Sequence, residues 1–162
     1  MTPLAWLLGF LLPACGATGA AGLPVPPPMD MTKLERPATP NTFLAGPAGM
    51  TPTPDQVTEP SPLAAPALYH KARAVFSGQP RTYVAAEFPD RLQLHYVVRS
   101  ALLNFPDLVT VQVDAAGPDR STLIIWSRSV YGRSDFGVNR QRTQAWLAVL
   151  QQSAVLQQST EQ

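Results

Sequence analysis

Proline is concentrated in one stretch of the chain, and this stretch limits where regular structure can form. Twelve of the 18 prolines in the 162-residue chain lie between Pro24 and Pro66. Each proline fixes φ and lacks an amide proton, so neither a regular helix nor a central β-strand is expected there. The repeated prolines favour extended, polyproline-like backbone. We therefore interpret residues 22–66 as a Pro-rich tether, of which residues 30–41 are suited to lie as a strap across the domain.

The first residues have the character of an export signal. Leu4–Leu12 is apolar and uncharged, and it is too short to span a bilayer as a helix. The sequence Leu-Pro-Ala-Cys-Gly that ends this run resembles the lipobox of bacterial lipoproteins, in which the cysteine is lipidated. We interpret residues 1–21 as a signal peptide with Cys15 as the lipidation site, and ordinary cleavage within residues 17–21 stays open. A lipid anchor would place the domain beside a membrane.

The rest of the composition excludes several classes of site. Charged residues make up 14% of the chain and the net charge is +1, which is too little clustered charge for nucleic-acid binding. Cys15 is the only cysteine, so an intrachain disulfide and a cysteine metal cluster are excluded. His70 and His95 lack metal-ligand spacing, and the chain has no phosphate-binding loop, dinucleotide fingerprint or nucleophile elbow. We predict neither a cofactor nor a metal.

Residues 67–152 carry the pattern of one small α+β domain. Apolar side chains at helical spacing predict a helix over residues 67–77, which ends before Gly78. Four strand-like segments follow and are joined by short turns, at residues 82–86, 92–100, 108–114 and 121–130. A final helix is predicted over residues 138–152, before a polar tail at 153–162. We predict a two-layer fold in the order α-β-β-β-β-α, with both helices on one face of a four-stranded antiparallel meander.

Alternation along the second predicted strand assigns its side chains to two faces. Leu94 and Tyr96 point one way, while Gln93 and His95 point the other. Because the second face is the more polar one, we expect His95 to be exposed.

The stretch Ser127–Arg140 joins the last strand to the last helix and is dense in Arg, Gly, Asp and Asn. Asp135 is expected to cap the helix that follows, and Asn139 is suited to hold the carbonyl groups of the loop. The candidate site residues are Arg99, Arg128, Arg133, Asp135, Asn139 and Arg140, with Arg142 nearby. One interpretation is structural, with Arg–Asp pairs and caps that stabilise the corner. The other is an anion site built from helix amides and arginine side chains.

Several blocks of the sequence resemble one protein family. They are Arg99–Asp107, Ser121–Ser129 and Gly132–Arg140, together with the Arg-Pro-Ala-Thr-Pro-Asn segment at Arg36–Asn41. The family is the bacterial domain-of-unknown-function family fourteen ninety-nine, and the resemblance covers most of Asp30–Leu150. It implies an exported or envelope-associated bacterial protein and brings no catalytic residue with it. It also implies that Arg36–Asn41 belongs to the domain.

Three hypotheses about function follow. The first is a non-catalytic envelope module, held at the periplasmic face of a bacterial membrane by Cys15 or soluble in the periplasm. It would bind an envelope protein, a lipid headgroup or another anionic ligand at the Arg-rich corner. The second is an enzyme of unfamiliar type, with Asp135 as base and arginines that hold an anionic substrate. The third is a structural subunit of an envelope assembly.

Overall fold

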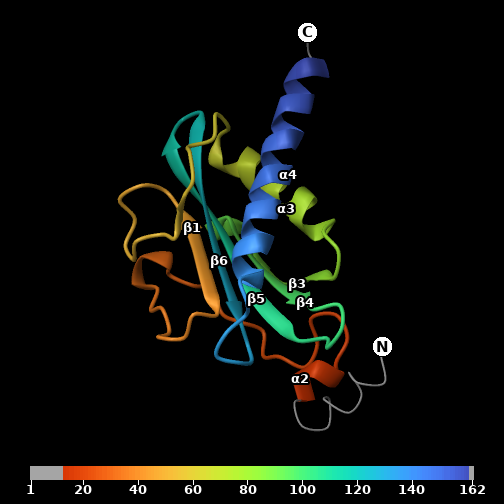
Figure 1. Cartoon of the computed structure of the whole chain (residues 1–162). Coiled ribbons are helices and arrows are strands. Elements are labelled where there is room, and N and C mark those ends of the chain that lie inside the picture. The colour runs from red at the N-terminus through yellow and green to blue at the C-terminus, as the bar shows by residue number, and fades with distance from the viewer. Residues whose placement is uncertain (1–12, 161–162) are drawn as a thin grey trace.

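The chain forms two layers, a single β-sheet and a pair of helices that cover one of its faces (Figure 1). The computed structural model describes residues 13–160, with side chains for residues 14–153, so most of the predicted signal peptide lies outside the described residues. The two helices are α3 (Ala65–Ser77) and α4 (Val138–Thr160). The α+β class and the placement of both helices on one face agree with the prediction from the sequence.

The sheet has six strands where four were predicted. They are β1 (Thr42–Gly46), β2 (Gln56–Val57), β3 (Thr82–Phe88), β4 (Gln93–Arg99), β5 (Pro106–Gly117) and β6 (Arg120–Ser129), in the spatial order β2-β1-β6-β5-β4-β3. The antiparallel meander β3–β6 is confirmed. However, β1 adds to β6 in antiparallel orientation and β2 pairs with β1 in parallel, so the sheet is mixed.

The two additional strands lie inside the Pro-rich stretch, where no strand was expected. β1 occupies the proline-free window between Pro40 and Pro47, and β2 occupies the window between Pro54 and Pro60. All amide groups of these strands are available for pairing, because proline removes a donor only at its own position. The prediction was wrong because it treated the density of proline as a property of the whole stretch.

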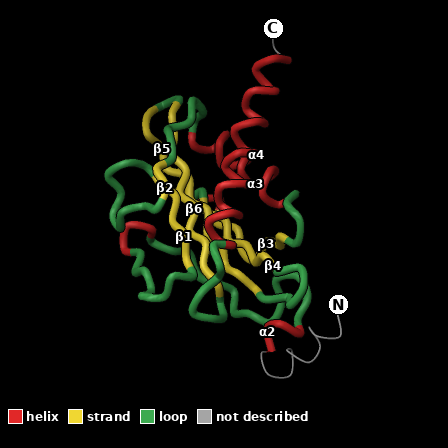
Figure 2. Tube along the Cα trace, viewed as in Figure 1, coloured by secondary structure: helices red, strands yellow, loops and turns green. Residues whose placement is uncertain are grey.

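The helices also differ from the prediction in number and length. A short helix, α2 (Pro13–Gly16), and two 3₁₀ turns, η1 (Met31–Lys33) and η2 (Pro89–Arg91), occur in addition to α3 and α4. Helix α4 continues to Thr160 and its last turns extend beyond the sheet (Figure 2). Among the described residues, no helix is both long and apolar enough to cross a bilayer.

The main core lies between the helices and the sheet. The ring of Trp146 on α4 stacks on Phe76 of α3, with centroids 4.7 Å apart. The same indole meets Tyr96 of β4 edge-on at 5.6 Å. These contacts join both helices to the sheet at β4, and aromatic pairs of this kind add to the stability gained by burial alone.

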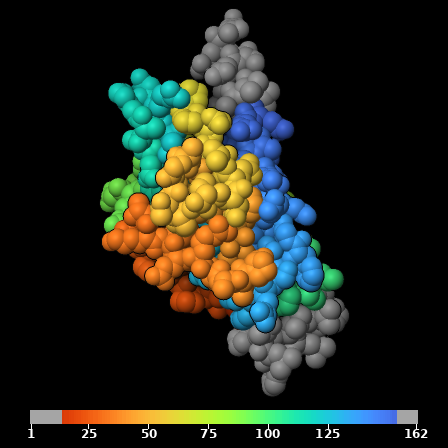
Figure 3. Space-filling view, turned by 60° about the vertical axis from the view of Figure 1, so that its left-hand side comes forward, coloured from red at the N-terminus to blue at the C-terminus, as the bar shows by residue number. Residues whose placement is uncertain are grey.

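The opposite face of the sheet is covered by part of the Pro-rich stretch (Figure 3). Met31 and Leu34 pack on Trp126 in a second apolar cluster. The side chain of Gln93 accepts a hydrogen bond from the amide of Met29 and donates one to its carbonyl oxygen, both at 2.8 Å. On this face His95 is 1% exposed and contacts Gln93 Oε1 and the ring of Phe88, so the expectation of an exposed His95 was wrong.

Candidate functional site

The corner between β6 and α4 is organised around the side chain of Asn139, which is completely buried. Its amide group donates hydrogen bonds to the carbonyl oxygen of Asn41, to Ser129 Oγ and to the carboxylate of Asp135. Its oxygen accepts a hydrogen bond from Ser127 Oγ at 2.5 Å. One side chain therefore links the end of β6, the first turn of α4 and the residue that precedes β1.

Asp135 caps helix α4, as the sequence predicts. Its Oδ1 accepts a hydrogen bond from the amide of Gly137 at 3.0 Å, and its Oδ2 accepts one from the amide of Asn139 at 2.7 Å. Negative charge at this position also complements the positive end of the helix dipole. Both carboxylate oxygens therefore accept hydrogen bonds from the chain itself, which favours the capping role of Asp135 over the hypothesis that it acts as a general base.

A buried ion pair lies beside this network, and its acidic member, Asp107, was not among the candidate residues. Arg142 Nη2 contacts Asp107 Oδ2 at 2.5 Å, and both side chains are at most 10% exposed. Arg142 Nη1 also donates to Asn139 Oδ1 at 2.9 Å. Asp107 lies in a sequence block that carries the family resemblance, which was the only signal for its importance. The pairing itself depends on the packing of α4 against β5.

The other predicted arginines divide into two groups. Arg128, Arg133 and Arg140 are exposed, and none of their side chains makes a hydrogen bond or an ion pair with any described residue. The guanidinium of Arg140 lies over the ring of Phe43, 5.2 Å from its centroid. Arg99 is 3% exposed and is not part of the corner, because its hydrogen bonds go to main-chain oxygens of residues 14–21 and of Asn104.

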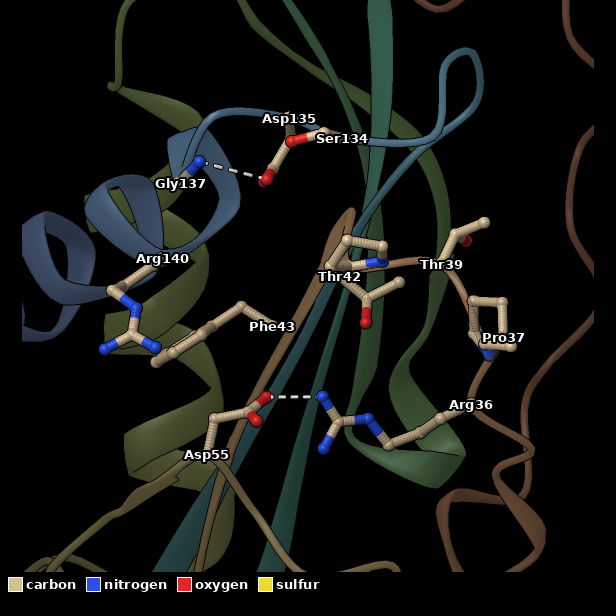
Figure 4. Close-up of a pocket in the computed structure, with 12 residues that line it drawn as sticks. Arg36, Pro37, Thr39, Thr42, Phe43, Asp55, Ser134, Asp135, Gly137 and Arg140 are labelled. Atoms are coloured by element: carbon tan, nitrogen blue, oxygen red, sulfur yellow. Dashed lines mark hydrogen bonds and ion pairs between the residues drawn. The ribbon is translucent and has the colours of Figure 1, made fainter.

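A polar cleft of about 430 Å³ opens between this corner and the Pro-rich segment (Figure 4). Residues 36–40 form one wall, and Ser134, Asp135, Gly137 and Arg140 form the other. Arg36 pairs with Asp55 at 2.7 Å, so these two charges neutralise each other. Within residues 13–160, no group of three or more His, Cys, Asp or Glu side chains is placed to hold a metal.

The cleft walls are the segments that carry the sequence resemblance, Arg36–Asn41 and Gly132–Arg140. The chain matches the family described as "Protein of unknown function (DUF1499)" over residues 34–150. The chain belongs to the DUF1499 family. Its matched region contains both walls of the cleft, the Asn139 network and the Arg142–Asp107 pair. No significant match was found among curated proteins or among solved structures.

Proposed function

We propose that this DUF1499 protein is an exported, envelope-located binding module whose cleft recognises an anionic group through Arg140. The observation that carries the proposal is the state of the Arg140 side chain. The Phe43 ring holds its guanidinium at the cleft wall, while its N–H donors have no partner among the described residues. The module binds its ligand without changing it covalently.

Arg140 is the cation in the cleft whose charge remains available to a ligand. Arg36 is paired with Asp55, and Asp135 is committed to the cap of α4. A guanidinium presents a planar set of donors that fits carboxylate or phosphate oxygens in pairs. Because the stacking on Phe43 orders this side chain in advance, less conformational entropy is lost when an anion binds.

The location of the module is proposed from the sequence that precedes it. An apolar run at Leu4–Leu12 leads into the lipobox-like sequence that ends at Cys15, which supports export and attachment to a membrane. Mass spectrometry of the mature N-terminus tests this part separately. A lipid-modified Cys15 is expected, whereas an unmodified terminus at Ala20 or Ala21 would reject the anchor.

The binding site is tested by NMR titration of the full chain with inorganic phosphate and, separately, with acetate. Shifts are expected at Arg140 and at the amide of Gly137, which line the same wall. Arg140→Ala should weaken binding at least about tenfold, and Arg140→Lys should weaken it less because it retains the charge. Arg120→Ala is the matched control, since Arg120 is also an exposed arginine but lies at the opposite end of β6.

The proposal is wrong if Arg140→Ala and Arg120→Ala bind both anions as tightly as the unmodified chain. It is also wrong if the shifts spread over exposed arginines throughout the surface, because that pattern indicates unspecific ion binding. Purification only as a complex of fixed stoichiometry, without anion binding, would instead favour a structural subunit of an envelope assembly.

A further inference from the structure

Arg99, at the end of β4, carries a buried charge that the corner network does not use. Its Nε donates to the carbonyl oxygen of Gly19 at 2.6 Å. Its Nη1 and Nη2 donate to the carbonyl oxygens of Ala14 and Ala21, both at 2.7 Å, and Nη1 also reaches the carbonyl oxygen of Asn104 at 3.2 Å. All three guanidinium nitrogens are therefore satisfied by main-chain oxygens.

This arrangement is unusual because a buried charge is normally paired with an opposite one. The ionisable groups that face Arg99 are the thiol of Cys15 and the phenols of Tyr83 and Tyr131, and no described carboxylate is among them. Burial lowers the pKa of Arg99. Without the carbonyl groups of residues 14–21, most donors of a 97% buried cation would lose their partners, which is strongly unfavourable.

Asn104 completes the same site. Its side-chain amide donates to the carbonyl oxygens of Cys15 at 2.6 Å and Ala17 at 2.9 Å. Together, the side chains of Arg99 and Asn104 donate hydrogen bonds to five carbonyl oxygens of residues 14–21, which are those of Ala14, Cys15, Ala17, Gly19 and Ala21. Every one of these contacts is to main chain, so the two side chains recognise the course of a peptide backbone.

The bound segment is suited to this role because it consists almost entirely of small residues, Ala-Cys-Gly-Ala-Thr-Gly-Ala-Ala. It turns back on itself at Gly22, which has a φ of +81°. A Cβ at Gly22 would lie 2.6 Å from the Cβ of Ala17 and 3.2 Å from the Cα of Ala14. Both the positive φ and the close approach therefore require glycine at this position.

We propose that Arg99 and Asn104 form a binding site for a peptide main chain, which this protein fills with its own residues 14–21. The two partners have different origins in the chain. Arg99 and Asn104 lie inside the region that matches the family, at residues 34–150, and the bound segment lies outside it. The family domain thus supplies the binding site, and the segment that follows the apolar run supplies the ligand.

Binding of this segment controls access to Cys15, the only cysteine of the chain. Cys15 is completely buried when the segment is bound, and burial raises the pKa of its thiol. Both effects slow reactions that need an accessible thiolate. Modification of Cys15 and binding of residues 14–21 therefore exclude each other, and the segment must leave the site before its thiol can react.

The proposal is tested by the rate at which iodoacetamide alkylates Cys15 in the full 162-residue chain. Arg99→Gln removes the charge and most of the donors, and Asn104→Ala removes the second contact. Gly22→Ala disturbs only the bound segment and leaves the site intact. Gly49→Ala is the matched control, because Gly49 also has a positive φ, of +80°, but has nothing within 4 Å of its Cβ position.

We expect Arg99→Gln and Gly22→Ala each to raise the alkylation rate at least about tenfold, while Gly49→Ala reacts as the unmodified chain does. Fluorescence of Trp126 and Trp146, both in the cores, reports whether each variant is folded. Equal rates in folded Arg99→Gln, Asn104→Ala and Gly22→Ala would overturn the proposal. If Arg99→Gln does not fold, Gly22→Ala gives the answer alone, since it does not alter the site.

Discussion

The side-chain amide of Asn139 donates a hydrogen bond to the main-chain carbonyl oxygen of Asn41 at 3.0 Å, although 98 positions separate the two residues. Asn41 in turn donates from its own side chain to the carbonyl oxygen of Gly132 at 2.8 Å. The two asparagines thereby fasten the start of β1 to the loop before α4. Both walls of the cleft depend on these contacts for their separation and their relative orientation.

Replacement of Asn139 by Ala should destabilise the fold by about 3 kcal/mol, because it leaves several buried polar partners unsatisfied at once. Urea unfolding followed by tryptophan fluorescence measures the change. Gln144→Ala, at an exposed position on the same helix, is the control and should change stability by less than about 0.5 kcal/mol. A loss below about 1 kcal/mol for Asn139→Ala would show that the network does not hold the corner.

The ion pair between Arg142 and Asp107 should behave differently from an exposed one. Arg142→Ala leaves the nearly buried carboxylate of Asp107 without its cation and should cost about 3–5 kcal/mol. Lys33→Ala breaks the pair between Lys33 and Asp30, whose side chains are 83% and 49% exposed, and should leave stability almost unchanged. The same unfolding assay compares the two variants. Similar losses would contradict the assigned difference in environment.

Phe136 lies at the tip of the corner loop, where it contributes little to the stability of the fold. Its side chain is 91% exposed, and its φ of +52° is in the left-handed region that favours glycine. Phe136→Gly should therefore leave stability unchanged or raise it by up to about 1 kcal/mol. Phe88→Gly, which removes a ring that packs against His95, should cost about 2 kcal/mol or more. A loss above 1 kcal/mol at position 136 would be inconsistent with its exposure.

The meander and the two long helices could be predicted because their signals are local. Alternation along β4 and the breaks at Gly78 and Pro80 lie within a few residues of the structure they specify. The cap formed by Asp135 was accessible for the same reason, since it contacts amides only two and four residues away.

The rest of the fold depends on contacts between distant parts of the chain. β1 is a strand because Leu44 pairs with Trp126, and nothing near Leu44 in the sequence reveals that partner. The same holds for Asn41 with Asn139 and for Arg99 with the carbonyl groups of residues 14–21. The composition of a segment can single out an arginine as a candidate. The partners of its side chain, however, depend on which distant segments the fold brings together.

The burial of His95 also depends on contacts that the local pattern does not show, since the neighbouring polar side chain on its face, Gln93, binds the main chain of Met29, 64 positions away. Burial lowers the pKa of His95 from 6.5 to about 4 in the folded state, while its Nε2 contacts Gln93 Oε1 at 2.7 Å. Between these two pH values the unfolded chain binds a proton that the folded chain does not. The contribution of neutral His95 to the free energy of unfolding is therefore fully present above about pH 6.5. It decreases by up to about 3 kcal/mol as the pH falls toward 4.

Urea unfolding between pH 7 and pH 4 should show this loss in the unmodified chain and a smaller one in His95→Gln, which lacks the titrating group. The difference in stability between the two proteins should therefore change by up to about 3 kcal/mol across this range, whatever the carboxylates contribute to both. His70→Gln is the control, because His70 is exposed and its replacement should retain the dependence of the unmodified chain. Parallel curves for the unmodified chain and His95→Gln would mean that the folded protein accommodates a charged His95, which is incompatible with its burial in the folded protein.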